Sequence, residues 1–141
     1  MKEEIKVIKI SENEYLVGNN TTTLINPNII LVEAIGDQTD ELALAQKEVC
    51  DTLVAQVEGK INYLIDLNQC GKNSKKARAT WIKINNQKKT LFVALYGLHP
   101  VAKVLATFIM GASGKKNFKF FSRREEALVW LIQMNGTIND D

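Results

Sequence analysis

The chain has little of the material from which metal centres and most catalytic sites are built. Its 141 residues include one histidine and two cysteines, and the cysteines, Cys50 and Cys70, form no Cys-x-x-Cys motif. So few cysteines also exclude a disulfide framework, which favours a reducing, cytoplasmic location. We therefore expect no metal and no cofactor.

Long apolar runs are missing as well. No stretch approaches the roughly 18 residues that a membrane-spanning helix needs, and residues 1–4 carry acids where a secretory signal carries bases. The composition, 45% hydrophobic and 24% charged, is that of an ordinary globular protein. The length fits one domain over residues 1–141, without a transmembrane segment.

Acidic and basic residues are unevenly distributed along the chain. Residues 1–66 hold twelve acids and five bases, whereas Leu67 to Arg124 holds thirteen bases and no acid. Such segregation attracts an anionic partner or a second copy of the chain. The alternative is that exposed lysines only keep the protein in solution. The net charge of +2 argues against a dedicated nucleic-acid-binding protein.

The hydrophobic periodicity changes along the chain from that of strands to an alternation of helices and strands. A helix capped by Thr39 and ended near Gly59 follows the N-terminal strands, and Ser74 or Asn73 begins the next helix. The order predicts an α/β domain: a mixed sheet with antiparallel N-terminal strands and a parallel βαβαβα C-terminal part. The strands are expected at residues 5–10, 14–17, 21–25, 29–35, 61–67, 91–96 and 117–121.

A third helix is predicted to begin at Pro100, a residue favoured at the first helical position. Its apolar residues recur at helical spacing, and we expect Val101, Val104, Leu105, Phe108 and Ala112 to form its core face.

Ligands of open α/β sheets gather beyond the carboxyl ends of the parallel strands. Lys75–Lys76 and Arg123–Arg124 stand at two helix starts there, where a cation is unfavourable by about 0.3–1 kcal/mol. A bound anion between the two pairs would explain the placement; the alternative is that the side chains extend into solvent. The predicted anion- or partner-binding edge consists of Asn68, Lys72, Asn73, Lys75, Lys76, His99, Arg123 and Arg124.

Catalytic machinery is not visible in the sequence. His99 has no second histidine with which to form a zinc site, and its place before Pro100 favours a capping or packing role. Cys70 lies in a predicted loop close to Lys72. Its thiol either has a lowered pKa because of the nearby positive charge or only fills space in the loop. We expect a protein that is not an enzyme.

Three segments of the C-terminal half resemble the SpoIIAA-like group of STAS/SEC14-type proteins, which are small bacterial domains. The segments are Val93-Ala94-Leu95-Tyr96-Gly97-Leu98-His99-Pro100-Val101-Ala102-Lys103-Val104, Phe118-Lys119-Phe120-Phe121-Ser122 and Glu125-Glu126-Ala127-Leu128-Val129-Trp130-Leu131. The resemblance covers roughly residues 60–132 and implies a STAS-like fold, with a mixed sheet and helices packed on it.

The resemblance implies two kinds of role. STAS proteins that antagonise anti-sigma factors carry a phosphorylatable serine at a helix start, and Ser74 is the candidate phosphoacceptor here, although the Asp-Ser-Ser-Gly-Leu pattern is absent. SEC14-type proteins hold a lipid-like ligand under a helix, for which Val101, Leu105 and Phe108 are the candidate apolar residues. We expect a cytoplasmic regulatory module that binds a protein partner or forms a homodimer; the alternative is a carrier of an apolar ligand.

Overall fold

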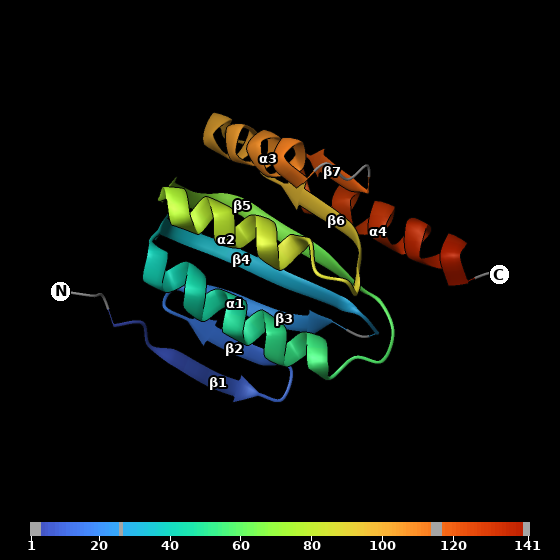
Figure 1. Cartoon of the computed structure of the whole chain (residues 1–141). Helices are drawn as coiled ribbons and strands as arrows, with labels where there is room; N and C mark the ends of the chain where they lie inside the picture. Colours follow the sequence, from blue (N-terminus) through green and yellow to red (C-terminus); the bar gives the residue numbers. More distant parts are fainter. Residues whose placement is uncertain (1–3, 26, 114–116, 140–141) are drawn as a thin grey trace.

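The computed structural model describes residues 4–25, 27–113 and 117–139. Within these ranges four antiparallel strands lead into three strand–helix crossovers and a final helix (Figure 1). The elements are β1 (Val7–Ser11), β2 (Glu14–Val17), β3 (Asn20–Ile25), β4 (Ile29–Gln38), α1 (Asp40–Ala55), β5 (Ile61–Asn73), α2 (Lys75–Asn85), β6 (Thr90–Tyr96), α3 (Pro100–Ser113), β7 (Phe118–Phe121) and α4 (Arg124–Asn139).

The strands form one sheet in which their spatial order is also their order in the chain. β1 to β4 pair antiparallel, and β4 to β7 pair parallel. The predicted α/β class, with its antiparallel first half and parallel second half, is therefore confirmed. Because the parallel strands are neighbours, their carboxyl ends meet at one edge of the sheet.

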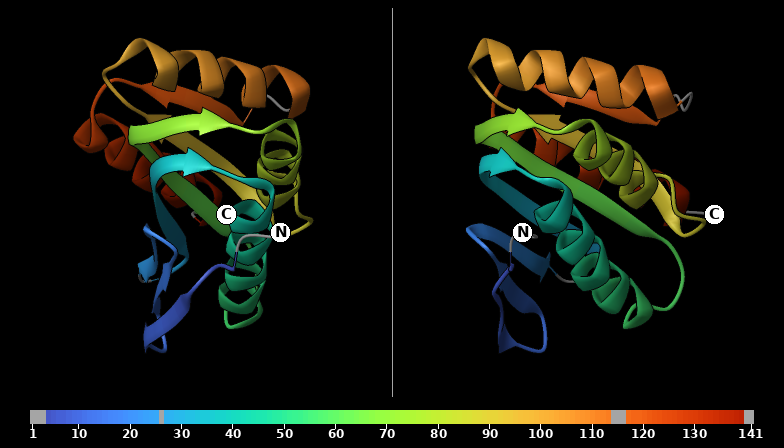
Figure 2. Two further views of the ribbon diagram at one scale, coloured as in Figure 1. Left: turned by 90° about the vertical axis from the view of Figure 1, so that its left-hand side faces the viewer. Right: turned by 60° about the vertical axis from the view of Figure 1, so that its left-hand side comes forward.

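The helices lie on both sides of the sheet. α1, α2 and α3 cover one face, and α4 packs on β5, β6 and β7 from the other (Figure 2). Each face has its own core, because the side chains of a strand alternate between the two faces. The larger core includes Val32, Leu53, Tyr63, Trp81, Leu95 and Ile109. The core under α4 includes Leu31, Leu64, Ala94, Tyr96, Ala127 and Leu131.

A buried amide network joins α1 to the sheet. Asn20 Nδ2 donates to Gln38 Oε1 at 2.9 Å and to Gln46 Oε1 at 3.2 Å. Gln46 Nε2 donates in turn to Thr22 Oγ1 at 2.7 Å. All four side chains are buried, so the hydrogen bonds compensate for the loss of solvation that burial imposes on their polar atoms.

β5 differs from the prediction. The sequence predicts a strand that ends at Leu67 and a loop after it, whereas the strand runs on to Asn73. Its last residues pair with the end of β4, where Gly36 lies opposite Cys70. Gly71 permits this approach, since a Cβ there would lie 3.1 Å from the Gly36 backbone. Backbone pairing thus outweighs the weak β-propensity of glycine and asparagine.

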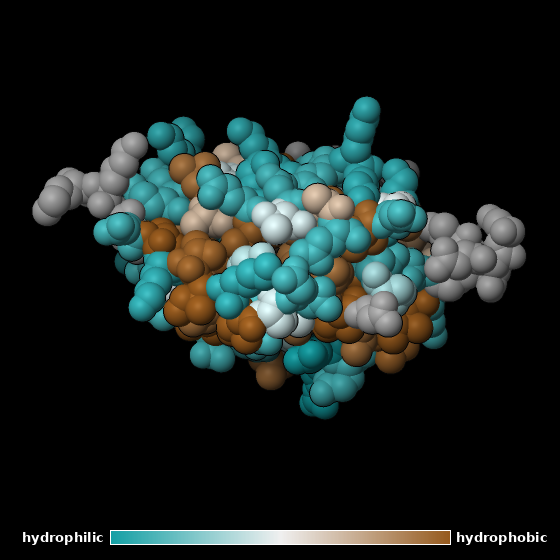
Figure 3. Space-filling view, turned by 90° about the horizontal axis from the view of Figure 1, so that it is seen from below, coloured by the Kyte–Doolittle hydropathy of each residue, from teal (hydrophilic) through white to brown (hydrophobic). Residues whose placement is uncertain are grey.

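The outer strand β1 leaves apolar side chains in solvent. Every residue of β1 is exposed, including Val7, Ile8 and Ile10. Seen from the β1 side, the surface carries apolar side chains among hydrophilic ones (Figure 3). Lys9 forms an ion pair with Glu12 at 3.0 Å, and charged residues on an edge strand oppose pairing with other sheets. Among the described residues, no helix combines the length and the apolar character needed to cross a bilayer.

Candidate functional site

The middle of β5 is tied to the turn before α3 through Asn68. Asn68 N and Nδ2 donate to Asp66 Oδ1 at 2.8 and 3.1 Å. Asn68 Oδ1 accepts the N–H of Leu98, in the turn between β6 and α3, at 3.0 Å. Asn68, a residue of the predicted edge, therefore links β5 to the turn before α3 through both the nitrogen and the oxygen of its side-chain amide.

His99 is held at the same junction by both of its ring nitrogens. Nε2 lies 2.8 Å from the carbonyl oxygen of Leu67, and Nδ1 accepts the N–H of Ala102 at 3.3 Å. Because a carbonyl only accepts, these partners require the proton on Nε2 and a lone pair on Nδ1. His99 thus caps α3, and neither nitrogen is left for a substrate or a metal.

Ser74 caps α2. Its hydroxyl oxygen accepts the N–H of Ala77 at 3.0 Å and its O–H donates to the carboxylate of Asp40, in the first turn of α1. The structural role expected of a serine at a helix start is present, with a link between two helices in addition. Lys75 and Lys76 follow it as exposed residues.

The two basic pairs do not share a site. Lys75 and Lys76 begin α2, which lies on the face of the sheet covered by three helices. Arg123 and Arg124 lie at the start of α4, on the opposite face (Figure 2). The sheet separates the pairs, so the structure does not form the expected anion site between them.

α3 presents a different face to the core than the sequence predicts. Its buried residues are Ala102, Leu105, Ala106 and Ile109. Of the predicted core face, Leu105 is buried, whereas Val101, Val104 and Phe108 are exposed; the side chain of Ala112 lies outside those that the structure describes. Small residues at 102 and 106 let the helix approach the sheet closely, and Val101, Val104 and Phe108 point outward.

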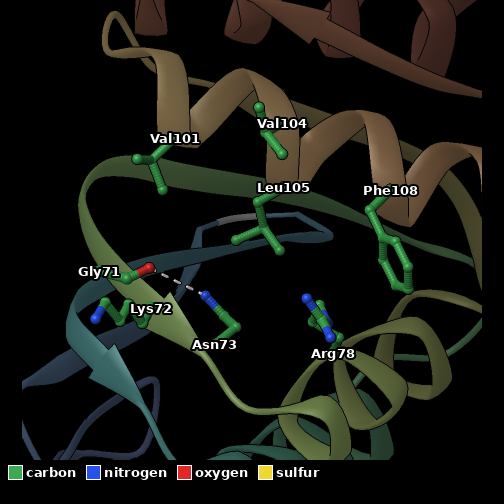
Figure 4. Close-up of a pocket in the computed structure, with 8 residues that line it drawn as sticks. All are labelled: Gly71, Lys72, Asn73, Arg78, Val101, Val104, Leu105 and Phe108. Atoms are coloured by element: carbon green, nitrogen blue, oxygen red, sulfur yellow. Dashed lines mark hydrogen bonds between the residues drawn. The ribbon is translucent and has the colours of Figure 1, made fainter.

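The outward side chains of α3 form one wall of a groove with a volume of about 360 Å³ (Figure 4). The end of β5 and the first turns of α2 form the opposite side (Figure 4). The lining residues are Gly71, Lys72, Asn73, Arg78, Val101, Val104, Leu105 and Phe108. The groove therefore joins two predicted edge residues, Lys72 and Asn73, to all three candidate apolar residues.

Arg78 is the lining residue that sequence reasoning missed. Its guanidinium carbon lies 5.1 Å from the ring centroid of Phe108, a cation–π contact across the groove. Its Nε is buried and has no hydrogen-bond partner in the part of the chain that the structure describes. The sequence places Arg78 beside Ala77, at the border of the buried stripe of α2, and this border position is the only signal that marks it.

Neither cysteine is an activated thiol. Burial raises the pKa of the Cys50 thiol from 9.0 to about 12, and burial also raises the pKa of Cys70. The reading of Cys70 as a thiol with a lowered pKa is therefore wrong. No group of three or more His, Cys, Asp or Glu residues within the described ranges is placed to hold a metal ion.

These pKa shifts predict slow thiol chemistry. At pH 8 the Cys50 thiol of the folded protein should react with a disulfide reagent at least about tenfold more slowly than in urea, and the Cys70 thiol should also react more slowly, since the thiolate is the reacting form. The reaction rates are measured by absorbance, once for the folded protein and once in urea. The Cys70→Ser variant gives the rate of Cys50 alone. A thiol that reacts at the unfolded rate in the folded protein would contradict the described burial.

Comparisons with known proteins agree with this fold. The profile of a family described as Domain of unknown function (DUF7793) matches residues 23–135. No curated protein matches the chain in sequence. Several solved structures are similar in fold. One is described as an uncharacterized protein of the DUF3478 family with a SpoIIAA-like fold, from Shewanella loihica PV-4. It has a TM-score of 0.59 and 19% sequence identity, and the likeness covers 91% of this chain and 92% of that one.

The second similar structure is that of the anti-sigma factor antagonist SpoIIAA in its unphosphorylated form. Its TM-score is 0.57 at 8% identity, and the likeness covers 79% of this chain and 96% of that one. At these identities the likeness establishes the fold alone. The resemblance noted in the sequence is thereby confirmed as a SpoIIAA-like fold.

Proposed function

The chain belongs to the family of domains of unknown function DUF7793, and we propose that it is a non-catalytic regulatory module that binds another protein on the outer face of α3. One observation carries the proposal. Leu98, Val101, Val104 and Phe108 are 72%, 50%, 70% and 45% exposed. Exposed apolar residues that cluster on one face of a protein mark interaction sites.

The surroundings of α3 support a binding role. The cap made by His99 and the contacts of Asn68 fix the start of the helix, so its outer side chains are presented on a rigid support. The structurally similar SpoIIAA is described as an anti-sigma factor antagonist, an activity exerted on another protein. A second copy of this chain is one candidate partner.

Ser74 supplies a site for regulation within this proposal. Phosphorylation of Ser74 would remove the O–H that now donates to the Asp40 carboxylate. It would also place nearly two negative charges beside that carboxylate. Repulsion would then separate the starts of α1 and α2, next to the β5 end of the groove. Lys75 and Lys76 stand at the same helix start as possible counter-charges.

Variants of α3 test the proposal. We expect Val101→Ser combined with Val104→Ser to lower the affinity for protein partners at least about tenfold, because truncating buried apolar anchors at an interface costs about 1–2 kcal/mol each. The measurement compares the proteins captured from the native host by immobilised wild type and by the variant. Sedimentation velocity of wild type and of the variant tests whether the partner is a second copy of the chain.

Val129→Ser combined with Ile132→Ser is the matched control. Val129 and Ile132 are 54% and 57% exposed, on α4, over the opposite face of the sheet. This pair should leave binding unchanged. Equal capture by the α3 and α4 variants would refute the proposal. Ser74→Asp and Ser74→Ala test the regulatory part: if both retain the wild-type partners at wild-type affinity, Ser74 is only a cap.

The groove favours a second candidate function, a carrier of a lipid-like ligand. Val101, Leu105 and Phe108 offer an apolar wall, and the volume of about 360 Å³ suits a small molecule. Native mass spectrometry of gently purified protein separates the two functions. A bound mass that is lost from a Leu105→Ser variant favours the carrier, and ligand-free protein favours the protein-binding module.

A further inference from the structure

We propose that the groove between α2 and α3 receives an acidic amphipathic segment of the partner protein. A carboxylate of that segment pairs with Arg78, and its apolar side chains contact Val101, Val104 and Phe108. The inference rests on the proposed function and adds the chemistry of the partner to it.

The first observation is the state of Arg78. Its side chain is partly buried and lines the groove, where its guanidinium lies over the face of the Phe108 ring. In the described parts of the chain the ion pairs are those of Lys9 with Glu12 and Lys47 with Asp51, so no carboxylate pairs with Arg78. A half-buried guanidinium without an anion is incompletely compensated for its lost solvation. Its planar fork of N–H donors fits a carboxylate in a bidentate manner.

The second observation is the charge around the groove. Both walls come from the segment between Leu67 and Arg124, which contains no Asp or Glu. Two acids of other segments lie close to the groove, one against the lining residue Lys72 and one against Ser74, and each accepts a hydrogen bond there. Asp37 Oδ1 accepts the N–H of Lys72 at 2.9 Å, and Asp40 accepts the hydroxyl of Ser74. Among the described residues no acid pairs with the Arg78 guanidinium, which leaves it available to a partner carboxylate.

The third observation is the spacing of the apolar wall. Val101, Val104 and Phe108 recur at helical spacing and extend over about 10 Å of α3, as the rise of 1.5 Å per residue gives. Two turns of an amphipathic helix have the same length and present anchors at i, i+3 or i+4 and i+7. A free inorganic anion would use Arg78 and leave this wall uncovered, whereas an acidic amphipathic segment uses both.

A library of random peptides displayed on phage tests the inference on the intact purified chain. Wild type should enrich peptides that combine Asp or Glu with Leu, Ile or Phe at helical spacing. Arg78→Gln should lose the enrichment in acids, and an enriched peptide should bind it at least about tenfold more weakly in fluorescence anisotropy. Lys83→Gln is the matched control, because it removes one charge from the same helix outside the groove, and it should change the affinity by less than about twofold. High salt should weaken binding to wild type.

Three results would overturn the inference: enriched peptides that are neutral or basic, equal affinity for wild type and Arg78→Gln, or no enriched peptide while anionic phosphatidylglycerol vesicles bind in an Arg78-dependent way.

Failure of the proposed function would give a different result. If the Val101→Ser, Val104→Ser protein keeps its captured partners, the proposed function fails. If it loses them while Arg78→Gln keeps them, only the acidic chemistry of the partner is refuted.

Discussion

Replacing Asn20 by alanine is expected to lower the free energy of unfolding by about 3 kcal/mol. The fully buried Asn20 amide donates to Gln38 and Gln46 at 2.9 and 3.2 Å. Its Oδ1 accepts the backbone N–H of Ile35 at 2.8 Å. Alanine would leave these groups buried without their partners, and each unsatisfied group costs about 1–3 kcal/mol.

Urea unfolding followed by circular dichroism measures the effect. Asn19→Ala is the control, because the neighbouring Asn19 is exposed in the turn before β3, and its stability should stay within about 0.5 kcal/mol of wild type. A loss below about 1 kcal/mol for Asn20→Ala would mean that the network around α1 does not contribute as described.

The second large effect is expected at Gly97, where β6 turns toward α3. A Cβ on Gly97 would lie 2.6 Å from Ala102 Cβ and 3.5 Å from the carbonyl carbon of Leu67. Both neighbours are buried, so Gly97→Ala must push α3 away from the Leu67 segment of β5. We expect a loss of about 2 kcal/mol in unfolding free energy, as for other overpacked sites.

A double-mutant cycle identifies the cause of that loss. Ala102→Gly removes the atom that the new Cβ would meet, and alone it costs about 1 kcal/mol through helix propensity. The double variant should be more stable than the sum of the single effects by at least about 0.5 kcal/mol. Strict additivity would show that the two positions do not clash. Gly111→Ala is the matched control, since a Cβ there meets no atom within 4 Å; it should be neutral or stabilising.

The helix starts were predictable from the sequence because they depend on local chemistry. Thr39 and Ser74 cap α1 and α2 by accepting N–H groups three residues on, at 3.2 and 3.0 Å. These contacts involve residues that are close in sequence, so residue type and spacing are sufficient to locate them. The same holds for the run of apolar residues in β6, which is buried by helices on both faces.

The length of β5 and the face of α3 were not predictable in this way. The sequence of residues 68–73 is typical of a loop. These residues form a strand because they pair with the end of β4. In α3 two apolar stripes, one position apart, have the same helical spacing. Periodicity cannot choose between them, and the small Ala102 and Ala106 turn inward because they fit against the sheet.

The sequence by itself determined the order of strands and helices, the capping residues and the segregation of charge, because each depends on residue types and short spacings. Only the tertiary structure decided which side of α3 faces solvent, placed Arg78 against Phe108, and put the basic starts of α2 and α4 on opposite faces of the sheet. Those features arise between segments far apart in the chain. They depend on how side-chain volumes fill the space between packed elements, which no local pattern encodes.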